Sequence, residues 1–149
     1  MTVTFFGHRD TPPQIQPVLE KTLIDLIENR GANVFYVGNQ GGFDRMVLLV
    51  LRKLKAMYLQ ISYAVVLACF TDKRTDVDYS ETLFPDGLEY SVPKFAISNR
   101  NRWMIDSSET VVTYVKHKYG GAASFEAIAQ RKGKFVINLA ETNNAIGKS

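Results

Sequence analysis

The chain has 149 residues, the length of one ordinary domain, and its net charge is +3. Hydrophobic residues make up 46% of the sequence and charged residues 22%, which excludes a generally disordered chain. The mild basic excess is compatible with phosphates or nucleic acid, but no run of Lys and Arg is dense enough for a nucleic-acid arm.

The first half of the chain alternates short apolar runs with amphipathic stretches. Residues 3–6 form a strand-like run, and residues 14–30 follow as a helix with apolar side chains at three- and four-residue steps. Pro12 and Pro13 can open this helix and Gly31 can close it. The next elements in chain order are a strand, a helix and a strand buried on both faces, over residues 34–37, 43–56 and 62–69.

The second half begins with a long acidic connection, residues 70–93, and then resumes the alternation. The predicted elements are a helix, a strand, a helix and a strand, over residues 96–105, 110–115, 120–131 and 135–139. Strands that alternate with helices indicate an α/β fold with a mainly parallel sheet, here of about five strands. We expect one domain over residues 1–140 and a polar tail over residues 141–149.

The sequence also bounds the setting of the protein. Its single cysteine, Cys69, lies in an apolar run, so we expect a buried thiol and neither an intrachain disulfide nor a zinc site. No window approaches the ~20 apolar residues that span a bilayer, and the N-terminus does not look like a signal peptide. We therefore expect a cytoplasmic protein without membrane contact, metal or cofactor.

Three polar segments that contain glycine follow predicted strands. Ligands of open parallel sheets bind beyond the carboxyl ends of the strands, so we expect these segments to share one site. In the first segment, Gly7 permits a tight turn, His8 can bind phosphate or act as an acid or base, and Arg9 can bind a phosphate or carboxylate. Alternatively, Arg9 pairs with Asp10 at a surface turn.

The second and third segments each place glycines where a helix begins. Such a position exposes backbone N–H groups and the positive end of the helix dipole, which favours anions. The expected ligand-binding residues are Gly38, Asn39, Gln40, Gly41, Gly42 and Asp44 in one segment, and Gly120, Gly121, Ala122, Ala123 and Ser124 in the other. Asp44 can cap the helix or hold a ribose hydroxyl, and Ser124 can bind phosphate or cap. The alternatives are a glycine-rich turn without ligand and plain helix capping.

A fourth element is the predicted helix that carries Arg100 and Asn101. Arg100 and Met104 are four residues apart and share a face, so Arg100 can reach the same crevice. Trp103 and Met104 are either core residues or stacking groups for a base. His8 and His117 both follow strands and can meet, although two histidines alone make a poor metal site.

Together these segments resemble the SLOG superfamily, and most closely its small YpsA-like branch. The similarity runs from Thr2 to Leu139. The residues that match the branch are 7–9, 38–44, 79–85, 100–104 and 120–123. The resemblance implies a Rossmann-like, three-layer domain that binds a nucleotide-derived ligand. It also implies a homodimer or higher homo-oligomer, for which the face around Trp103 and Met104 is a candidate interface.

One related branch, the cytokinin-activating phosphoribohydrolases, carries Arg-Lys-x-x-Met and Gly-Gly-x-Gly-Thr-x-x-Glu, with the Arg and the Glu as the catalytic pair. Arg100 matches that Arg, but Ala127 stands where the Glu belongs. Glu126 is one residue early and points about 100° away on a helix. If the protein is an enzyme, Arg100 and Glu126 are the candidate pair, with Glu81 or Asp78 as substitute carboxylates.

Three hypotheses follow. The preferred one is a non-catalytic protein that senses or sequesters a nucleotide-, cyclic-nucleotide- or NAD-derived signal, including a phage protein that acts against host defence signalling. Its phosphate would lie on Gly120, Gly121 and Ser124, and its ribose near Gly38, Gly41 and Asp44. The alternatives are a nucleoside-monophosphate phosphoribohydrolase and, less expected, a nucleic-acid-binding or scaffold protein.

Overall fold

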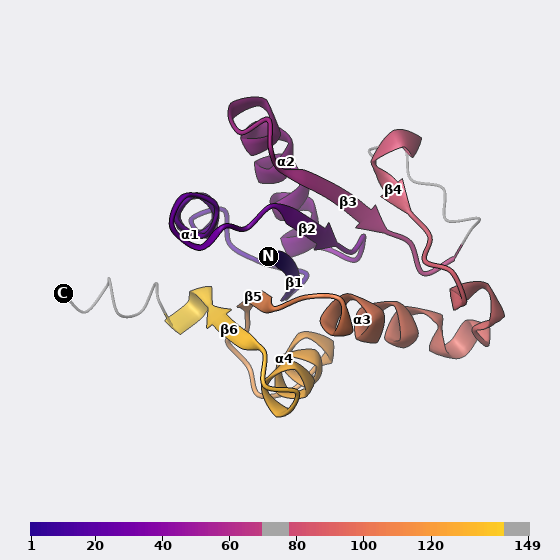
Figure 1. The fold of residues 1–149 in the computed structure, drawn as a ribbon. Coiled ribbons are helices and arrows are strands. Elements are labelled where there is room, and N and C mark those ends of the chain that lie inside the picture. The colour runs from indigo at the N-terminus through magenta and orange to yellow at the C-terminus, as the bar shows by residue number, and fades with distance from the viewer. Residues whose placement is uncertain (70–77, 142–149) are drawn as a thin grey trace.

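The computed structural model describes residues 1–69 and 78–141. Its centre is one open sheet of six parallel strands in the order β4-β3-β2-β1-β5-β6 (Figure 1). The strands are β1 (Thr2–Gly7), β2 (Val34–Val37), β3 (Ser62–Val66), β4 (Thr82–Leu83), β5 (Thr110–Tyr114) and β6 (Phe135–Asn138). The helices are α1 (Ile15–Arg30), α2 (Gly42–Met57), α3 (Ala96–Asp106) and α4 (Gly121–Arg131), with 3₁₀ turns η1 (Tyr79–Glu81), η2 (Leu88–Tyr90) and η3 (Pro93–Phe95). The predicted α/β class is confirmed.

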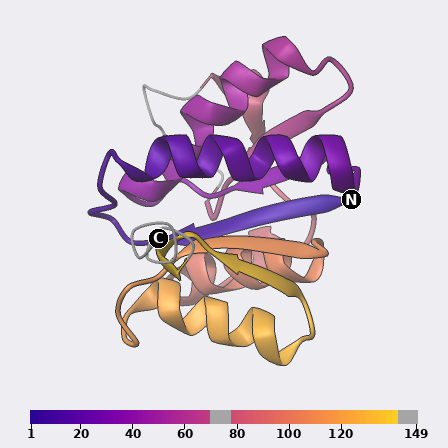
Figure 2. The ribbon, with the colours of Figure 1, turned by 90° about the vertical axis from the view of Figure 1, so that its left-hand side faces the viewer.

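The sheet is the middle of three layers. Helices α1 and α2 cover one face, and α3 and α4 cover the other (Figures 1 and 2). Strand β1 shows how the sequence fills both faces, because Phe5 belongs to the core on the α1–α2 side and the next residue, Phe6, to the core on the α3–α4 side. The expected apolar face of α1 is buried through Leu19, Leu23 and Leu26.

The strand order reverses at β1, which lies between β2 and β5. The chain fills the sheet outward from β1 to β4 and then returns to add β5 and β6 on the other side. When the edge strand β4 is left out and the other five strands are numbered again along the chain, their order in the sheet is 3-2-1-4-5. This is the order of a doubly wound, Rossmann-like sheet. The switch point, where such sheets bind ligands, is therefore between the carboxyl ends of β1 and β5.

Four points of the prediction differ from the structure. The third strand ends at Val66 rather than at residue 69, and Cys69 lies exposed on the connection that follows instead of being buried. The same strand is not buried on both faces, because Ser62 at its start is exposed. The acidic connection also holds a sixth strand, β4, that the pattern did not indicate, while residues 70–77 and the tail over 142–149 lie outside the described residues.

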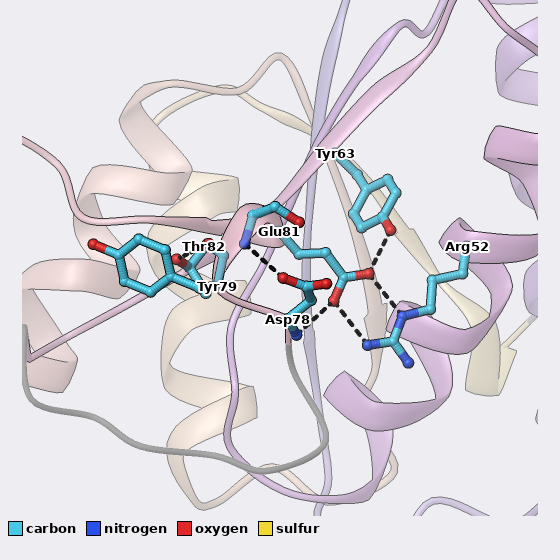
Figure 3. A network of polar contacts seen from close by, with 7 residues as sticks. Arg52, Tyr63, Asp78, Tyr79, Glu81 and Thr82 are labelled. Carbon is cyan, nitrogen blue, oxygen red and sulfur yellow. Dashed lines mark hydrogen bonds and ion pairs between the residues drawn. The ribbon is translucent and has the colours of Figure 1, made fainter.

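The connection is attached to the sheet by a polar network around Glu81 (Figure 3). The Arg52 side chain donates to both carboxylate oxygens of Glu81 at 2.8 Å, and the Tyr63 hydroxyl donates to Oε1 at 2.6 Å. The backbone N–H of Asp78 donates to the same carboxylate at 3.1 Å, and the Asp78 side chain in turn caps η1. This network fixes η1 and β4 against α2 and β3.

The prediction that Met104 belongs to an interface between copies of the chain is wrong. Met104 is 1% exposed in the core between α3, α4 and the sheet, and Trp103 packs against Tyr36 with ring centroids 5.1 Å apart. The core interpretation is thus confirmed for Met104, whereas Trp103 is half-buried and packs against the edge of this core.

Candidate ligand-binding site

A cavity of about 390 Å³ opens at the carboxyl end of β1, next to the switch point. We call it the switch-point cavity. The expected ligand-binding residues that line it are Gly7, His8, Arg9, Gln40, Asp44, Arg100, Asn101, Gly121 and Ala122. The fold therefore brings parts of all four predicted segments to one place.

The loops after β1 and β2 interlock beside this cavity. The backbone N–H of Gly42 donates to the Arg9 carbonyl at 2.9 Å, and a Cβ on Gly42 would stand 2.3 Å from that oxygen. Gly41 has φ +93°, and a Cβ there would stand 2.7 Å from the Arg9 side chain. These glycines serve the protein's own packing, and the first turn of α2 is covered by the loop that carries Arg9.

Two further glycines are also required by close contacts inside the protein. A Cβ on Gly7 would lie 2.3 Å from the Phe43 ring. One on Gly38 would lie 3.0 Å from the Asp44 carboxylate and 3.2 Å from the Arg100 guanidinium carbon. The space beside Gly38 is therefore filled by side chains of the protein, which leaves no room there for a ribose.

Arg100 lines the cavity and is only 1% exposed. Its Nη1 donates to the Asn39 side-chain oxygen at 2.9 Å and to the Val66 carbonyl at 3.0 Å, and its Nε donates to the Asn101 side-chain oxygen at 2.7 Å. These bonds hold the guanidinium between β2, β3 and α3. Much of its donor capacity is thus used by the protein, which limits what it can offer a ligand.

Asp44 occupies the first turn of α2 and points back toward the preceding loop. Its Oδ2 accepts a hydrogen bond of 2.8 Å from the Gln40 backbone N–H. Gln40 precedes the N-cap residue Gly41, so this bond ties the first turn of α2 to the loop before it and does not cap the helix. Because both Asp44 and Gln40 line the cavity, this bond also fixes one polar wall of it.

The N-terminus of α4 differs from that of α2. Gly120 has φ +94° and caps α4 in nearly the same backbone conformation as Gly41 before α2. Apart from chain neighbours and the helix's own backbone, however, no atom of the described residues lies within 4 Å of a Cβ built on Gly120 or Gly121. Gly121 and Ala122 line the switch-point cavity, whereas Ala123 lines a different cavity and Ser124 is exposed. The first turn of α4 is therefore open to the cavity.

His8 and His117 meet beside this turn, as the sequence suggested, with ring centroids 4.9 Å apart. The His8 Nε2 accepts hydrogen bonds from the backbone N–H groups of Lys116 at 2.9 Å and His117 at 3.4 Å. Burial and the neighbouring His117 lower the pKa of His8, while Asp10 acts in the opposite direction. His8 is thus a neutral acceptor that joins the loops after β1 and β5.

Arg100 and Glu126, the candidate catalytic pair, lie in different cavities. Glu126 accepts a hydrogen bond from the Thr113 hydroxyl and lines a cavity of about 420 Å³ between α4 and β6. Neither substitute carboxylate replaces it, because Glu81 and Asp78 are both engaged in the network of Figure 3. None of these three predicted carboxylates therefore lines the switch-point cavity with Arg100, and the carboxylate that does line it, Asp44, is engaged by the Gln40 backbone N–H.

Most of the apolar lining of the cavity was missed by the sequence reasoning, which placed only Met104 on the same face as Arg100. Phe5, Phe6, Ile97, Met104 and Phe125 contribute to it. Ile97 lies three residues before Arg100, and Phe125 lies four residues after Gly121, so helical spacing from the polar candidates was a usable signal for both.

Among residues 1–69 and 78–141, no group of three or more His, Cys, Asp or Glu side chains is arranged to hold a metal ion. No helix in that same part of the chain is long and apolar enough to cross a membrane.

Comparison with known proteins leaves the family of the chain open but agrees on its fold. No protein-family model matches the sequence, and no curated protein matches it either. A solved structure of DNA processing protein A from Helicobacter pylori, described for its single-stranded DNA binding mode, superposes with a TM-score of 0.60 at 19% sequence identity. The match covers 99% of this chain and 72% of that chain. At this identity the similarity shows a shared Rossmann-like fold.

Proposed function

We propose that the protein binds a phosphorylated, nucleotide-type small molecule in the switch-point cavity, as a binding protein rather than an enzyme. The observation that carries the proposal is the open first turn of α4 at this cavity. Gly121 and Ala122 line it, and among the described residues no other segment comes within 4 Å of a Cβ on Gly120 or Gly121.

The first turn of α4 suits the phosphate. Free backbone N–H groups and the positive end of a helix dipole bind anions, and a glycine lets the ligand approach the backbone closely. The exposed residue Arg9, which also lines the cavity, adds a positive charge. The equivalent turn of α2 is less suited, because the Arg9 carbonyl already accepts its Gly42 N–H.

The polar wall of the cavity suits the hydroxyl groups of a sugar. Gln40, Asp44 and Asn101 line it with amide and carboxylate groups that accept or donate hydrogen bonds. These residues replace Gly38 and Gly41 as the proposed contacts of the ribose, because neighbouring side chains of the protein fill the space beside those two glycines. We infer the same general role that the SLOG resemblance implies, a protein that senses or sequesters a nucleotide-derived signal.

The test is binding of nucleoside monophosphates, measured by calorimetry and by the melting temperature. A Gly121→Val variant places a side chain in the open space and should abolish the ligand-induced rise in melting temperature. The control Ala56→Val makes a similar change at an exposed position near the far end of α2 and should bind like the unmodified chain. Equal binding by both variants would remove the proposal.

A second candidate is binding of single-stranded DNA, which the structural neighbour is described to do. It is favoured by a run of exposed residues from Lys116 to Tyr119, because Lys116 and Lys118 alternate with His117 and Tyr119, whose rings stack 5.1 Å apart. Basic groups interleaved with aromatic rings are typical of single-strand binding.

If this candidate is right, the logarithm of the affinity for single-stranded DNA decreases linearly with the logarithm of the salt concentration. The slope should be less steep in a double variant that carries Lys116→Ala and Lys118→Ala. Fluorescence anisotropy of a labelled oligonucleotide measures the slope. If nucleotide binding persists while no oligonucleotide binds even at low salt, the first candidate alone stands.

A further inference from the structure

A second cavity adjoins the switch-point cavity on the same edge of the sheet. It has a volume of about 490 Å³ and lies beyond the carboxyl ends of β3 and β4. We call it the β3–β4 cavity. Gln40 and Ile97 line both cavities, so the two are neighbours with a common border.

The lining of the β3–β4 cavity is largely apolar. Its apolar residues include Ala68, Phe84, Leu88, Pro93, Ala96 and Ile97. Ile97 is 46% exposed at the border, where no other part of the described chain covers it fully. Apolar cavities with a few polar groups are the usual sites for the flat, hydrophobic part of a small ligand.

The polar side chains that line this cavity are those of Gln40, Glu89 and Ser91, and the Glu89 carboxylate accepts a hydrogen bond of 2.8 Å from the Gly87 backbone N–H. The Gln40 side chain has both a donor and an acceptor, and its contact with Asn39 is long at 3.5 Å. Ser91 also lines the cavity, and its hydroxyl oxygen accepts a hydrogen bond of 3.1 Å from Asn99. An amide beside an apolar cavity matches the hydrogen-bonding edge of a nucleobase.

Helix α3 connects the two cavities. Ala96 and Ile97 at its start line the β3–β4 cavity, and Ile97, Arg100 and Asn101 line the switch-point cavity. A ligand with a charged end and an aromatic end can therefore lie along the first turns of this helix. Its phosphate would be at α4, and its ring would be beneath Leu88 and Phe84.

From this geometry we infer that the β3–β4 cavity holds the base of the ligand, so that the protein selects nucleoside monophosphates over sugar phosphates without a base. The inference rests on the proposed function, because it assumes that the phosphate binds in the switch-point cavity.

The experiment compares AMP with ribose 5-phosphate by calorimetry, using the full chain. AMP is expected to bind at least about tenfold more tightly, because only AMP has a group that enters the apolar cavity. Leu88→Glu replaces an apolar lining residue with a second carboxylate beside Glu89 and should reduce AMP affinity to that of ribose 5-phosphate, while the affinity for ribose 5-phosphate stays unchanged. Val92→Glu is the matched control, since Val92 is 57% exposed on the same connection and lines neither cavity.

A second variant covers the case in which Leu88→Glu does not fold, as judged by circular dichroism. Ala96→Leu narrows the same cavity without adding charge and should also weaken AMP selectively. Equal affinities for AMP and ribose 5-phosphate, or variants that leave their ratio unchanged, would overturn the inference while the proposed function stands. Binding of neither compound would overturn the proposed function itself.

Discussion

At the scale of single residues, Arg100 shows how a predicted ligand residue can have a structural role. Its guanidinium is buried and joins the Val66 carbonyl to the side chains of Asn39 and Asn101. A rigid, planar donor group can reach three acceptors in different directions, whereas a lysine ammonium is a single point charge on a flexible stem. Loss of activity or binding in an Arg100 variant would therefore report partly on folding.

We predict that Arg100→Lys lowers the free energy of unfolding by about 2–4 kcal/mol, because it leaves buried acceptors without their donor. Urea unfolding followed by circular dichroism measures the change. Arg102→Lys is the control, since Arg102 is exposed on the same helix and its replacement should have little effect. Equal stability of the two variants would show that the buried hydrogen bonds of Arg100 contribute little.

At the scale of elements, the two-residue strand β4 depends on the polar network around Glu81. The hydrogen bonds from Arg52, more than any other interaction, lower the pKa of Glu81 to about 2, and burial acts against them. Burial, together with the bond to Glu81, raises the pKa of Tyr63 to about 12. The charged carboxylate and the neutral phenol are therefore the forms that hold β4 to the sheet at neutral pH.

Glu81→Gln should reduce the free energy of unfolding at pH 7 by about 1–2 kcal/mol, a modest value because Arg52 remains partly in contact with water. The pKa of Glu81 is lower in the folded state than its ordinary value of 4.5, so its stabilising contribution is fully present above that value. The contribution should decrease as the pH falls from 4.5 towards 2.

Unfolding curves of Glu81→Gln and the unmodified chain between pH 7 and pH 2 measure this dependence. Asp86→Asn, at an exposed position of the same connection, is the control for a general loss of negative charge. A stability difference for Glu81→Gln that does not change with pH would contradict the explanation.

The two loops that place glycines before helices also have different functions. The glycines before α2 allow the β1 loop to pack against them, whereas those before α4 border open space. Sequence analysis predicts an anion site at both sets of glycines, because a pattern of glycines does not show whether a neighbouring loop covers them.

Gly42→Ala should destabilise the protein by about 2–4 kcal/mol, since its Cβ would stand 2.3 Å from the Arg9 carbonyl oxygen. Gly121→Ala occupies the corresponding position in α4, where no other segment of the described chain would come within 4 Å of the added Cβ, and should leave stability unchanged or slightly increased. Differential scanning calorimetry compares them, and similar melting temperatures would contradict the assignment of these roles.

At the scale of the whole molecule, the sequence predicts the layers and the edge at which the cavity forms. Periodic apolar residues such as Leu19 and Leu23 identify the helices, and the glycines that follow β1, β2 and β5 indicate the carboxyl edge of the sheet. Strand β4 was missed because two residues, Thr82 and Leu83, are too short for a period-two pattern. The exposure of Cys69 was missed because the apolar run continues beyond the point where the strand ends.

The division of polar residues between cavities also depends on tertiary packing. Arg100 and Glu126 are separated because they lie on different helices and face different cavities, which only the arrangement of α3 and α4 determines. For the same reason, the β3–β4 cavity has no sequence signature, since its residues come from several separate segments.

The most direct test of the central proposal is a titration of the ¹⁵N-labelled chain with AMP, followed by amide chemical shifts. The backbone amides of Gly121 and Ala122, together with those of His8 and Arg9, should shift in a saturable way, while the amide of Leu23 in α1 should not. The absence of saturable shifts, or shifts confined to residues such as Ala127 and Gln130 that line the cavity between α4 and β6, would contradict it.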